Sequence, residues 1–457
     1  MIHAAEAADN PEPKGPQSSS RAVPFRDAFA VWLRVACLSF GGPAGQIAVM
    51  HRIVVEEKRW ISEARFLHAL QFCTLLPGPE AQQLATYLGW LLHGARGGLC
   101  AGVLFVLPGA LAMLALSALY VASERIAWID ALFFGVQAAV LAIVFEALLR
   151  LGKRTRGRAG RGSIAAAAFA ALFFFGVPFP LVIAGAALAG WALARRANLA
   201  SSSTAEPDPV PLRATPAPTL RRALALLGGF GVLWALPFAL LHPRLGFPPV
   251  LLDIASFFSQ CAVVTFGGAY AVLAYVADEA VRSYAWLEPQ QMIDGLGLAE
   301  TTPGPLILVL QFVAFLGGWN HAGALSPALV AVLASLVALW VTFVPCFLWI
   351  FLGAPYVERL RGSRSLDGML GGISAAVVGV IANLSLWFAL HVLFGSVDEH
   401  HAGPLRLLLP RLETLNVAAL VLAAFAFLAL LRWKLGMAKT LLLCAALGLG
   451  ASELGFA

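Results

Sequence analysis

The residues best suited to chemistry in this sequence surround two Pro-Gly-Pro tripeptides, at 77–79 and 303–305, each inside an apolar segment. Two prolines around a glycine interrupt an α-helix, because proline removes a backbone donor and glycine weakens the helix further. A new helix that begins after each tripeptide would offer free backbone N–H groups and the positive end of its dipole. The pattern therefore predicts a site that binds an anion.

Gly-Gly pairs stand ahead of both tripeptides, at Gly41-Gly42 and at Gly267-Gly268. Glycine has no Cβ, so the backbone at these pairs can approach a ligand closely. Four such elements, meeting where the two halves of the chain face each other, would form a compact cradle for an anion. The candidate substrate-binding residues are Arg34, Gly41, Gly42, Pro77, Gly78, Pro79, Glu80, Gln82, Gln83, Gly267, Gly268, Glu300, Thr301, Thr302, Pro303, Gly304 and Pro305.

Simpler roles remain open for some of these residues. Each tripeptide could be a plain kink that improves helix packing, and Arg34 could be an interfacial residue whose side chain reaches the headgroups. Glu80 and Glu300 could cap the helix that follows the break. Alternatively, Glu80 carries a proton while the anion is bound, because desolvation and a neighbouring like charge both favour a protonated carboxyl.

Signatures of catalysis are missing from the sequence. There is no P-loop, no H-E-x-x-H and no G-x-S-x-G, and the six cysteines form no C-x-x-C pair. The run Asp398–His401 contains metal-ligand types but falls in a loop, and His68 with Asp294 is the nearest approach to an intramembrane catalytic pair. We expect no catalytic residue, no metal site and no cofactor, and a transporter rather than an enzyme or an assembly protein.

Composition places these motifs inside a membrane. Of the 457 residues, 60% are hydrophobic and only 12% are charged, whereas soluble domains carry roughly 25% charged residues. The apolar residues come in blocks of about 20, the length that spans a bilayer core as a helix. The net charge of +6 comes from clusters beside these blocks. Such clusters are typical of cytoplasmic loops, so the lipid bilayer, and not nucleic acid, is the expected partner.

Thirteen apolar segments are predicted, six in each half and one between the halves. They run at 25–50, 66–92, 97–121, 128–150, 164–176, 180–195, 222–241, 251–276, 291–317, 324–352, 368–395, 412–431 and 437–456. The predicted divisions are a disordered tail at 1–24, an N-terminal transport repeat at 25–196, a Pro/Ala/Ser-rich linker at 197–220, an inverting transmembrane helix at 221–249 and a C-terminal transport repeat at 250–457.

The two halves repeat each other at a constant offset, since Phe-Gly-Gly at 40–42, Trp60 and Pro-Gly-Pro at 77–79 each recur 226 residues later. Basic clusters then set the orientation. The basic clusters Arg150–Arg161 and Arg359–Arg364 both predict cytoplasmic loops. In the first half, the loop that corresponds to Arg359–Arg364 lies one membrane segment before Arg150–Arg161. That loop is therefore on the outer side of the membrane. The halves thus have inverted topology, a recurrent plan of secondary transporters, with a cytoplasmic N-terminus and a periplasmic C-terminus.

Each interrupted segment is either a broken spanning helix or a re-entrant hairpin. The arm at 66–76 would rise about 16 Å as a helix, roughly half a bilayer, which fits both arrangements. The loop at 51–65 is basic and its repeat partner at 277–290 is acidic. This difference favours hairpins, with the basic loop inside and the acidic loop outside.

At these motifs the sequence resembles the chromate ion transporter family in its long, two-domain form. The matching stretches in the first half are Phe40-Gly-Gly-Pro43 with Gln46-Ile47-Ala48, Arg59-Trp60-Ile61-Ser62-Glu63 and Leu75-Leu-Pro-Gly-Pro-Glu-Ala-Gln-Gln-Leu84. In the second half they are Thr265-Phe-Gly-Gly-Ala-Tyr270, Trp286-Leu287 and Glu300-Thr-Thr-Pro-Gly-Pro305. The likeness covers nearly the whole chain apart from the tail and the linker.

The resemblance implies efflux of chromate across a bacterial inner membrane, with chromate resistance as the result and sulfate as a structural mimic of the substrate. The residues alone lead only to an inverted-repeat transporter with an anion site. Sulfate or another tetrahedral oxyanion is therefore the alternative substrate. The coupling ion and the oligomeric state, a homodimer included, are left open by the sequence.

Overall fold

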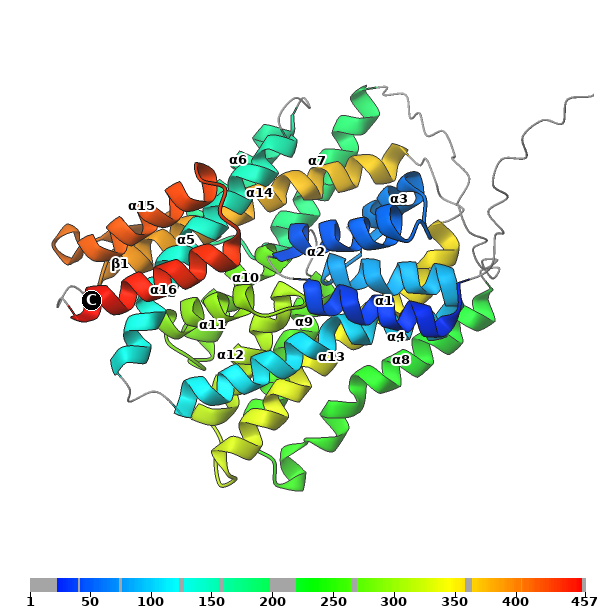
Figure 1. Cartoon of the computed structure of the whole chain (residues 1–457), viewed down its shortest axis with the longest axis horizontal. Helices are drawn as coiled ribbons and strands as arrows, with labels where there is room; N and C mark the ends of the chain where they lie inside the picture. Colours follow the sequence, from blue (N-terminus) through cyan, green and yellow to red (C-terminus); the bar gives the residue numbers. More distant parts are fainter. Residues whose placement is uncertain are drawn as a thin grey trace, which may run out of the picture.

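The computed structural model is a bundle of α-helices with one small β-hairpin (Figure 1). It describes residues 23–39, 42–73, 76–122, 127–155, 160–197, 219–264, 269–357, 364–403 and 405–453. The predicted tail at 1–24 and linker at 197–220 lie almost wholly outside these residues, as do the loop at 123–126 and most of the Arg359–Arg364 cluster.

The helices follow the same order in both halves of the chain. The first half contains α1 (Phe25–Leu38), α2 (Gly42–His51), η1 (Arg52–Glu57), α3 (Glu63–Cys73), α4 (Glu80–Ala122), α5 (Ala127–Thr155), α6 (Arg161–Phe173) and α7 (Phe179–Ala197). Between the halves lie α8 (Leu220–Leu240) and a turn, η2 (Pro243–Leu245). The second half contains α9 (Val250–Val264), α10 (Ala269–Asp278), η3 (Glu279–Ser283), α11 (Pro289–Thr301), η4 (Leu306–Leu308), α12 (Val309–Asn320), α13 (Pro327–Val357), α14 (Arg364–Leu393), β1 (Val397–Ala402), β2 (Leu405–Pro410), η5 (Leu412–Thr414), α15 (Val417–Leu431) and α16 (Met437–Glu453).

Helix α4 is bent back on itself at His93 and Gly94, whose backbone leaves the helical region. Gly94 has φ +66°, a conformation that glycine adopts without strain. The two arms then pack so tightly that a Cβ at Gly89 would touch the Gly97 carbonyl oxygen at 2.5 Å. In the second half, α12 and α13 form the corresponding pair of helices, joined by an ordinary loop.

The helices on either side of each Pro-Gly-Pro also fold back against each other. In the first half, the rings of Phe72 on α3 and Tyr87 on α4 lie 5.2 Å apart. In the second half, a Cβ at Gly295 on α11 would meet the ring of Phe312 on α12. At the far end of that pair, the Asn320 amide donates to the Trp286 carbonyl at 2.9 Å. Each tripeptide therefore lies at the tip of a helical hairpin.

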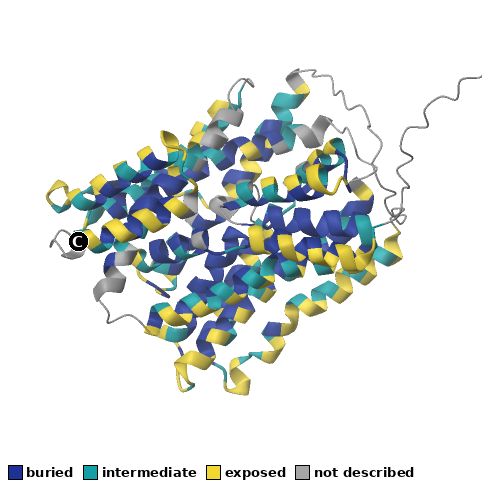
Figure 2. Ribbon diagram, in the orientation of Figure 1, coloured by how far each residue is buried: buried dark blue, intermediate teal, exposed yellow. Residues whose placement is uncertain are grey.

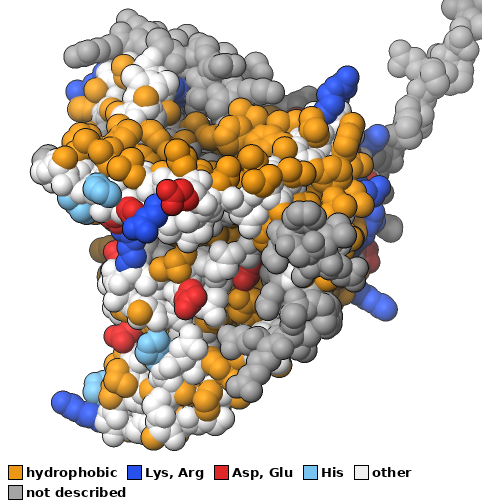
Figure 3. Space-filling view, turned by 90° about the vertical axis from the view of Figure 1, so that its left-hand side faces the viewer, with side chains coloured by type: hydrophobic (Ala, Val, Ile, Leu, Met, Phe, Trp, Pro, Cys, Tyr) orange, Lys and Arg blue, Asp and Glu red, His pale blue; other side chains and the backbone are white. Residues whose placement is uncertain are grey.

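Buried side chains run through the middle of the bundle and exposed ones around it (Figure 2). Within the described ranges, four helices are long and apolar enough to cross a membrane: Glu80–Ala122, Leu220–Leu240, Pro327–Tyr356 and Gly371–Leu393. Several shorter apolar helices accompany them. A band of hydrophobic side chains runs across the upper part of the face drawn in Figure 3. An apolar surface of this extent is stable in lipid and not in water, which agrees with an all-α membrane protein.

Two local features differ from the sequence prediction. Residues 397–410 form an antiparallel hairpin in which Val397 pairs with Pro410, where the sequence suggested only a loop. The hairpin is tied to the first half, because the Arg406 backbone N–H donates to the Phe174 carbonyl at 2.6 Å. The sequence predicts that segment 25–50 is interrupted at Gly41-Gly42-Pro43, but in the structure α1 ends at Leu38, and Gly42 and Pro43 already belong to the first turn of α2, where proline is tolerated.

Candidate functional site

The second Pro-Gly-Pro is held against the interruption between α1 and α2 of the opposite half. The Gly304 backbone N–H donates to the Ser39 carbonyl at 2.8 Å. The Gln46 amide of α2 donates to the Gly304 carbonyl at 2.5 Å. Gly304 has φ +92°, a backbone conformation that residues with a side chain rarely adopt. Both polar groups of this glycine are therefore used in bonds between the halves.

Helix α4 supplies the surface on which this loop rests. A Cβ at Gly109 would collide with the Pro303 carbonyl oxygen, and a Cβ at Gly304 would lie 3.2 Å from the Phe105 carbonyl. Gly109 follows Pro108, which is inside α4. The absence of a side chain at Gly109 lets the loop approach the helix backbone directly.

The first Pro-Gly-Pro makes the reciprocal contact with the second half. Gly78 has φ +117°, and a Cβ there would lie 2.7 Å from Cys346 Sγ on α13. Cys346 follows Pro345 inside α13, just as Gly109 follows Pro108 inside α4. The Gln83 amide donates to the Pro77 carbonyl at 2.6 Å and fixes the shape of the loop. Each tripeptide thus docks on a Pro-small-residue pair in the long helix of the other half.

Four glutamine side chains near these loops are buried with an amide oxygen that has no hydrogen-bond partner among the described residues: Gln46, Gln82, Gln83 and Gln311. In three of them the NH2 group donates to a backbone carbonyl, so the oxygen must point elsewhere; Gln311, for example, donates to the Ala110 carbonyl at 3.0 Å. A buried polar atom without a partner costs about 1–3 kcal/mol. Several such atoms together are typical of a site that a ligand or water completes.

The helix that follows the first tripeptide begins as predicted, because α4 starts at Glu80 directly after Pro79. The Gln83 backbone N–H already bonds to the Pro79 carbonyl at 3.1 Å. Glu80 lies in the first turn, where a carboxylate interacts favourably with the helix dipole. After the second tripeptide, the 3₁₀ turn η4 comes before α12, so the new α-helix begins later than predicted.

The structure brings most of the predicted site residues to these two loops. Glu300 and Thr302 are buried at the end of α11, 3% and 4% exposed. Arg34 is placed differently: its side chain is half exposed and donates to the Glu57 carboxylate at 2.7 Å. Gly41, Gly267, Gly268 and the side chain of Thr301 lie outside the described parts.

The sequence prediction missed several residues that contact the loops, namely Ser39, Gln46, Gly109 and Cys346. Gln46 had a detectable signal, since it is a lone amide in an apolar run four residues after Gly42. The Pro108-Gly109 pair could have been noted as a second weak point in an apolar helix. Nothing in the sequence near Cys346 connects it with a tripeptide 268 residues earlier.

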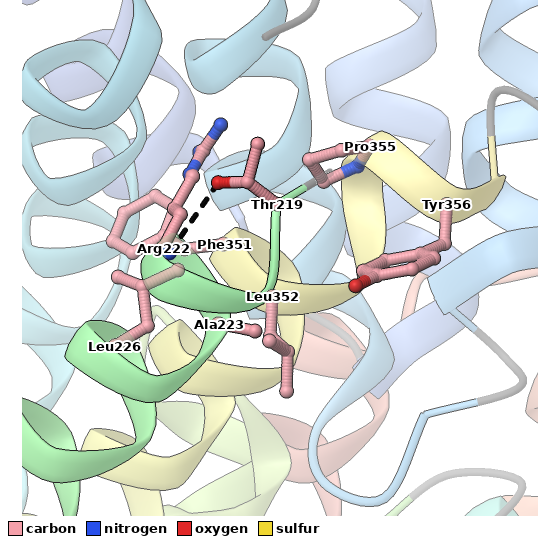
Figure 4. Close-up of a pocket in the computed structure, with 8 residues that line it drawn as sticks. All are labelled: Thr219, Arg222, Ala223, Leu226, Phe351, Leu352, Pro355 and Tyr356. Carbon is pink, nitrogen blue, oxygen red and sulfur yellow. Dashed lines mark hydrogen bonds between the residues drawn. The ribbon is translucent and has the colours of Figure 1, made fainter. Parts of the chain in front are cut away.

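A pocket between the start of α8 and the end of α13 is separate from these loops (Figure 4). It is lined by Thr219, Arg222, Ala223, Leu226, Phe351, Leu352, Pro355 and Tyr356. Thr219 caps α8 by accepting the Arg222 backbone N–H at 3.4 Å. The lining includes no residue of either Pro-Gly-Pro loop.

A bundle of long apolar helices, with two interrupted hairpins locked across its halves, defines a multi-pass membrane protein of the transporter class. The sequence pattern of the chromate transporter family matches residues 26–191 and 252–449. The chain belongs to the chromate transporter family.

Known relatives agree with this assignment. The chain is 34% identical to a chromate transport protein of Pseudomonas aeruginosa over 377 residues, which cover 80% of this chain and 83% of the relative. It is 29% identical to the chromate transport protein of Cupriavidus metallidurans over 363 residues, covering 78% and 80%. A probable chromate transport protein of Synechococcus elongatus is 28% identical over 364 residues, covering 77% and 81%. No solved structure matches the chain.

Proposed function

We propose that this chain exports chromate across the cytoplasmic membrane and thereby makes a cell resistant to chromate. Family membership supports the substrate, because relatives that match about four fifths of the chain are named chromate transport proteins. The observation that supports the anion site is the pair of docked Pro-Gly-Pro loops with four buried glutamine amides beside them. An oxyanion only accepts hydrogen bonds, so the amide oxygens do not bind it. Each NH2 group has two N–H donors, and on this proposal the one that is not bonded to the protein donates to the oxyanion.

Export is also the direction that the membrane potential favours. A dianion that leaves an inside-negative cell gains about 4.6 kcal/mol per 100 mV, twice the value for a single charge. That free energy sustains a concentration ratio of about three decades without ATP. The same potential would oppose uptake of the dianion by an equal amount.

We further propose that the two halves are inverted repeats with re-entrant hairpins at the Pro-Gly-Pro loops. Contacts at the hairpin ends support this: His93 lies against the Val23 carbonyl at 2.7 Å, near the N-terminus, while Trp286 lies against Asn320. On this proposal, Val23 and His93 are cytoplasmic, Trp286 and Asn320 are periplasmic, and α8 inverts the second half. The C-terminus is then periplasmic, and a reporter fused after Ala457 should be active only outside the cytoplasm.

Transport is best tested in vesicles that contain the purified chain. Vesicles loaded with defined ions and held at an imposed potential should move radioactive chromate in the direction that the potential favours, and empty vesicles should not. Expression in a chromate-sensitive host should lower accumulation of the ion. Unchanged tolerance and accumulation, despite insertion of the protein, would refute chromate as the substrate.

Sulfate or another tetrahedral oxyanion is the alternative substrate on the same site. Hydrogen bonds from backbone and amide groups respond mainly to charge and size, and sulfate shares both with chromate. A competition experiment in the same vesicles distinguishes the two substrates. If sulfate is the substrate, the vesicles should transport sulfate, and chromate should inhibit that transport only weakly.

A further inference from the structure

A carboxylate that the anion site does not use lies buried in the second half. Asp294 on α11 is only 5% exposed. Its Oδ2 accepts a hydrogen bond from the Tyr120 hydroxyl of α4 at 2.8 Å, and its Oδ1 accepts one from the Gln137 amide of α5 at 2.6 Å. Three helices thus meet at one carboxyl group.

The hydrogen bonds around Asp294 have a fixed direction. The Gln290 amide donates to Gln137 Oε1. Gln137 must therefore turn its N–H toward Asp294. Gln290 stands near the start of α11 on an exposed position, while Gln137 is 5% exposed. The chain of amides leads from the end of the hairpin to the buried carboxyl and aims a donor at it.

Tyr120 allows the same network to hold a protonated carboxyl. A phenol hydroxyl can donate to a carboxylate or accept from a carboxylic acid, whereas the Gln137 N–H can bond to Oδ1 in either state. When Oδ2 takes up one proton, the bond with Tyr120 reverses its direction and is kept. Ionisable groups buried inside a membrane protein are expensive to keep and are functional candidates by default.

The group is also placed to sense the state of the anion site. Asp294 and Tyr120 join α11 to α4, and the loop that directly follows α11 rests on the same helix α4, where the Pro303 carbonyl lies against Gly109. Gly109 and Tyr120 are about 16 Å apart along α4. A change at either contact therefore alters the fit of α11 on α4 at the other, which is the requirement for coupling between two sites.

The corresponding position in the first half, 226 residues earlier, is His68. The carboxyl site is therefore present once per chain and not once per repeat. The titratable group that faces it from α4 is Tyr120, α5 presents the neutral Gln137, and Glu300 follows two turns later on α11.

We propose that Asp294 binds a proton and couples its movement to that of the anion, with Tyr120 as the positioning residue. The proposal rests on the proposed anion transport. A chain that exchanges one proton for one oxyanion uses Asp294 in the charged form in one direction and in the neutral form in the other.

The test measures the final chromate ratio across vesicles that contain the whole chain, at zero potential and with an imposed pH gradient. Coupling of one proton to one anion changes this ratio by about tenfold per pH unit. The final ratio does not depend on the transport rate, so a slower variant is still informative. Asp294→Asn should give a ratio that no longer follows the pH gradient.

Two further variants separate coupling from packing. Tyr120→Phe should shift the pH profile of transport toward alkaline pH, because the charged carboxylate loses a donor. Ser117→Ala is the matched control, and its pH profile should match the wild type. Ser117 is a buried hydroxyl one turn away on α4, and it donates to the Met113 carbonyl of its own helix.

A ratio that follows the pH gradient equally in the wild type and in Asp294→Asn would overturn the proposal. The proposal would also be overturned if the wild type transports chromate but its final chromate ratio does not respond to the pH gradient. The proposed function would still stand in that case. If vesicles with the wild-type protein transport no chromate, both the proposed function and the coupling role of Asp294 would be refuted. If Asp294→Asn fails to insert, an unshifted pH profile for Tyr120→Phe would overturn the coupling role.

Discussion

Replacing Gly109 by alanine tests whether the docked Pro303–Pro305 loop is needed for transport. A Cβ at Gly109 falls so close to the Pro303 carbonyl oxygen that one of the two groups must move by about 1 Å to reach a normal contact. The loop is the movable partner, since α4 is a continuous helix at this point. Its displacement would break the bonds of Gly304 to Ser39 and Gln46.

The expected size of the effect follows from those two bonds. Each contributes about 1 kcal/mol, so losing both costs about 2 kcal/mol. That energy lowers the ratio of docked to undocked loop by about 30-fold, which sets the largest fall expected in chromate transport. Alanine is a better helix former than glycine by about 1 kcal/mol, so α4 itself should not be weakened.

The assay compares chromate flux per inserted molecule in vesicles. Gly228→Ala is the matched control, because Gly228 is a helical glycine on α8 with nothing within 4 Å of an added Cβ. Gly190→Ala is a second control, since its Cβ would meet the Gly368 carbonyl between α7 and α14, away from the loops. It should reduce the amount of folded protein but not the flux per molecule. Wild-type flux from Gly109→Ala would refute the reasoning.

Three further changes test other parts of the structure. Replacing either tripeptide, 77–79 or 303–305, by three alanines should leave insertion intact and abolish transport, because a continuous helix would replace the loop; normal flux from both variants would make the breaks mere packing features. Glu80→Gln should flatten the pH profile of transport if Glu80 carries a proton, and a full parental profile would leave Glu80 as a helix cap. The Arg411 guanidinium holds the pKa of the Asp398 carboxyl below its usual value. The β-hairpin should therefore lose amide protection in hydrogen exchange as the pH falls below about 4, and Arg411→Gln should remove this dependence.

The sequence predicted the helices well because their signals are local. Apolar blocks of membrane length gave α4, α8, α13 and α14, and both Pro-Gly-Pro tripeptides fall between helices as expected. The β-hairpin at 397–410 was missed, because Asp398–His401 are polar and do not alternate with apolar residues. Its partner strand supplies the apolar side chains, and only the pairing makes both segments strands.

The candidate site was predicted in part, for a physical reason. Backbone breaks are visible in the sequence, since they depend on proline and glycine at one place. Their contacts are not, because Gly304 bonds to Gln46, which lies 258 residues away. Arg34 was chosen as an intramembrane charge, but its pairing with Glu57 depends on how η1 returns toward α1. The inverted repeat and the membrane orientation stay predictions.

The reciprocal docking of the two tripeptides has a consequence for synthesis of the chain. The loop at 77–79 leaves the ribosome long before Cys346, on which Gly78 rests. At about 5–20 residues per second, the wait is roughly 13–54 s. If the hairpin is re-entrant, as we propose, its interrupted backbone then enters the bilayer before its final support is made, and exposed N–H and C=O groups are costly there. Lipid headgroups, water or an insertion chaperone must shelter this loop until translation of α13 is complete.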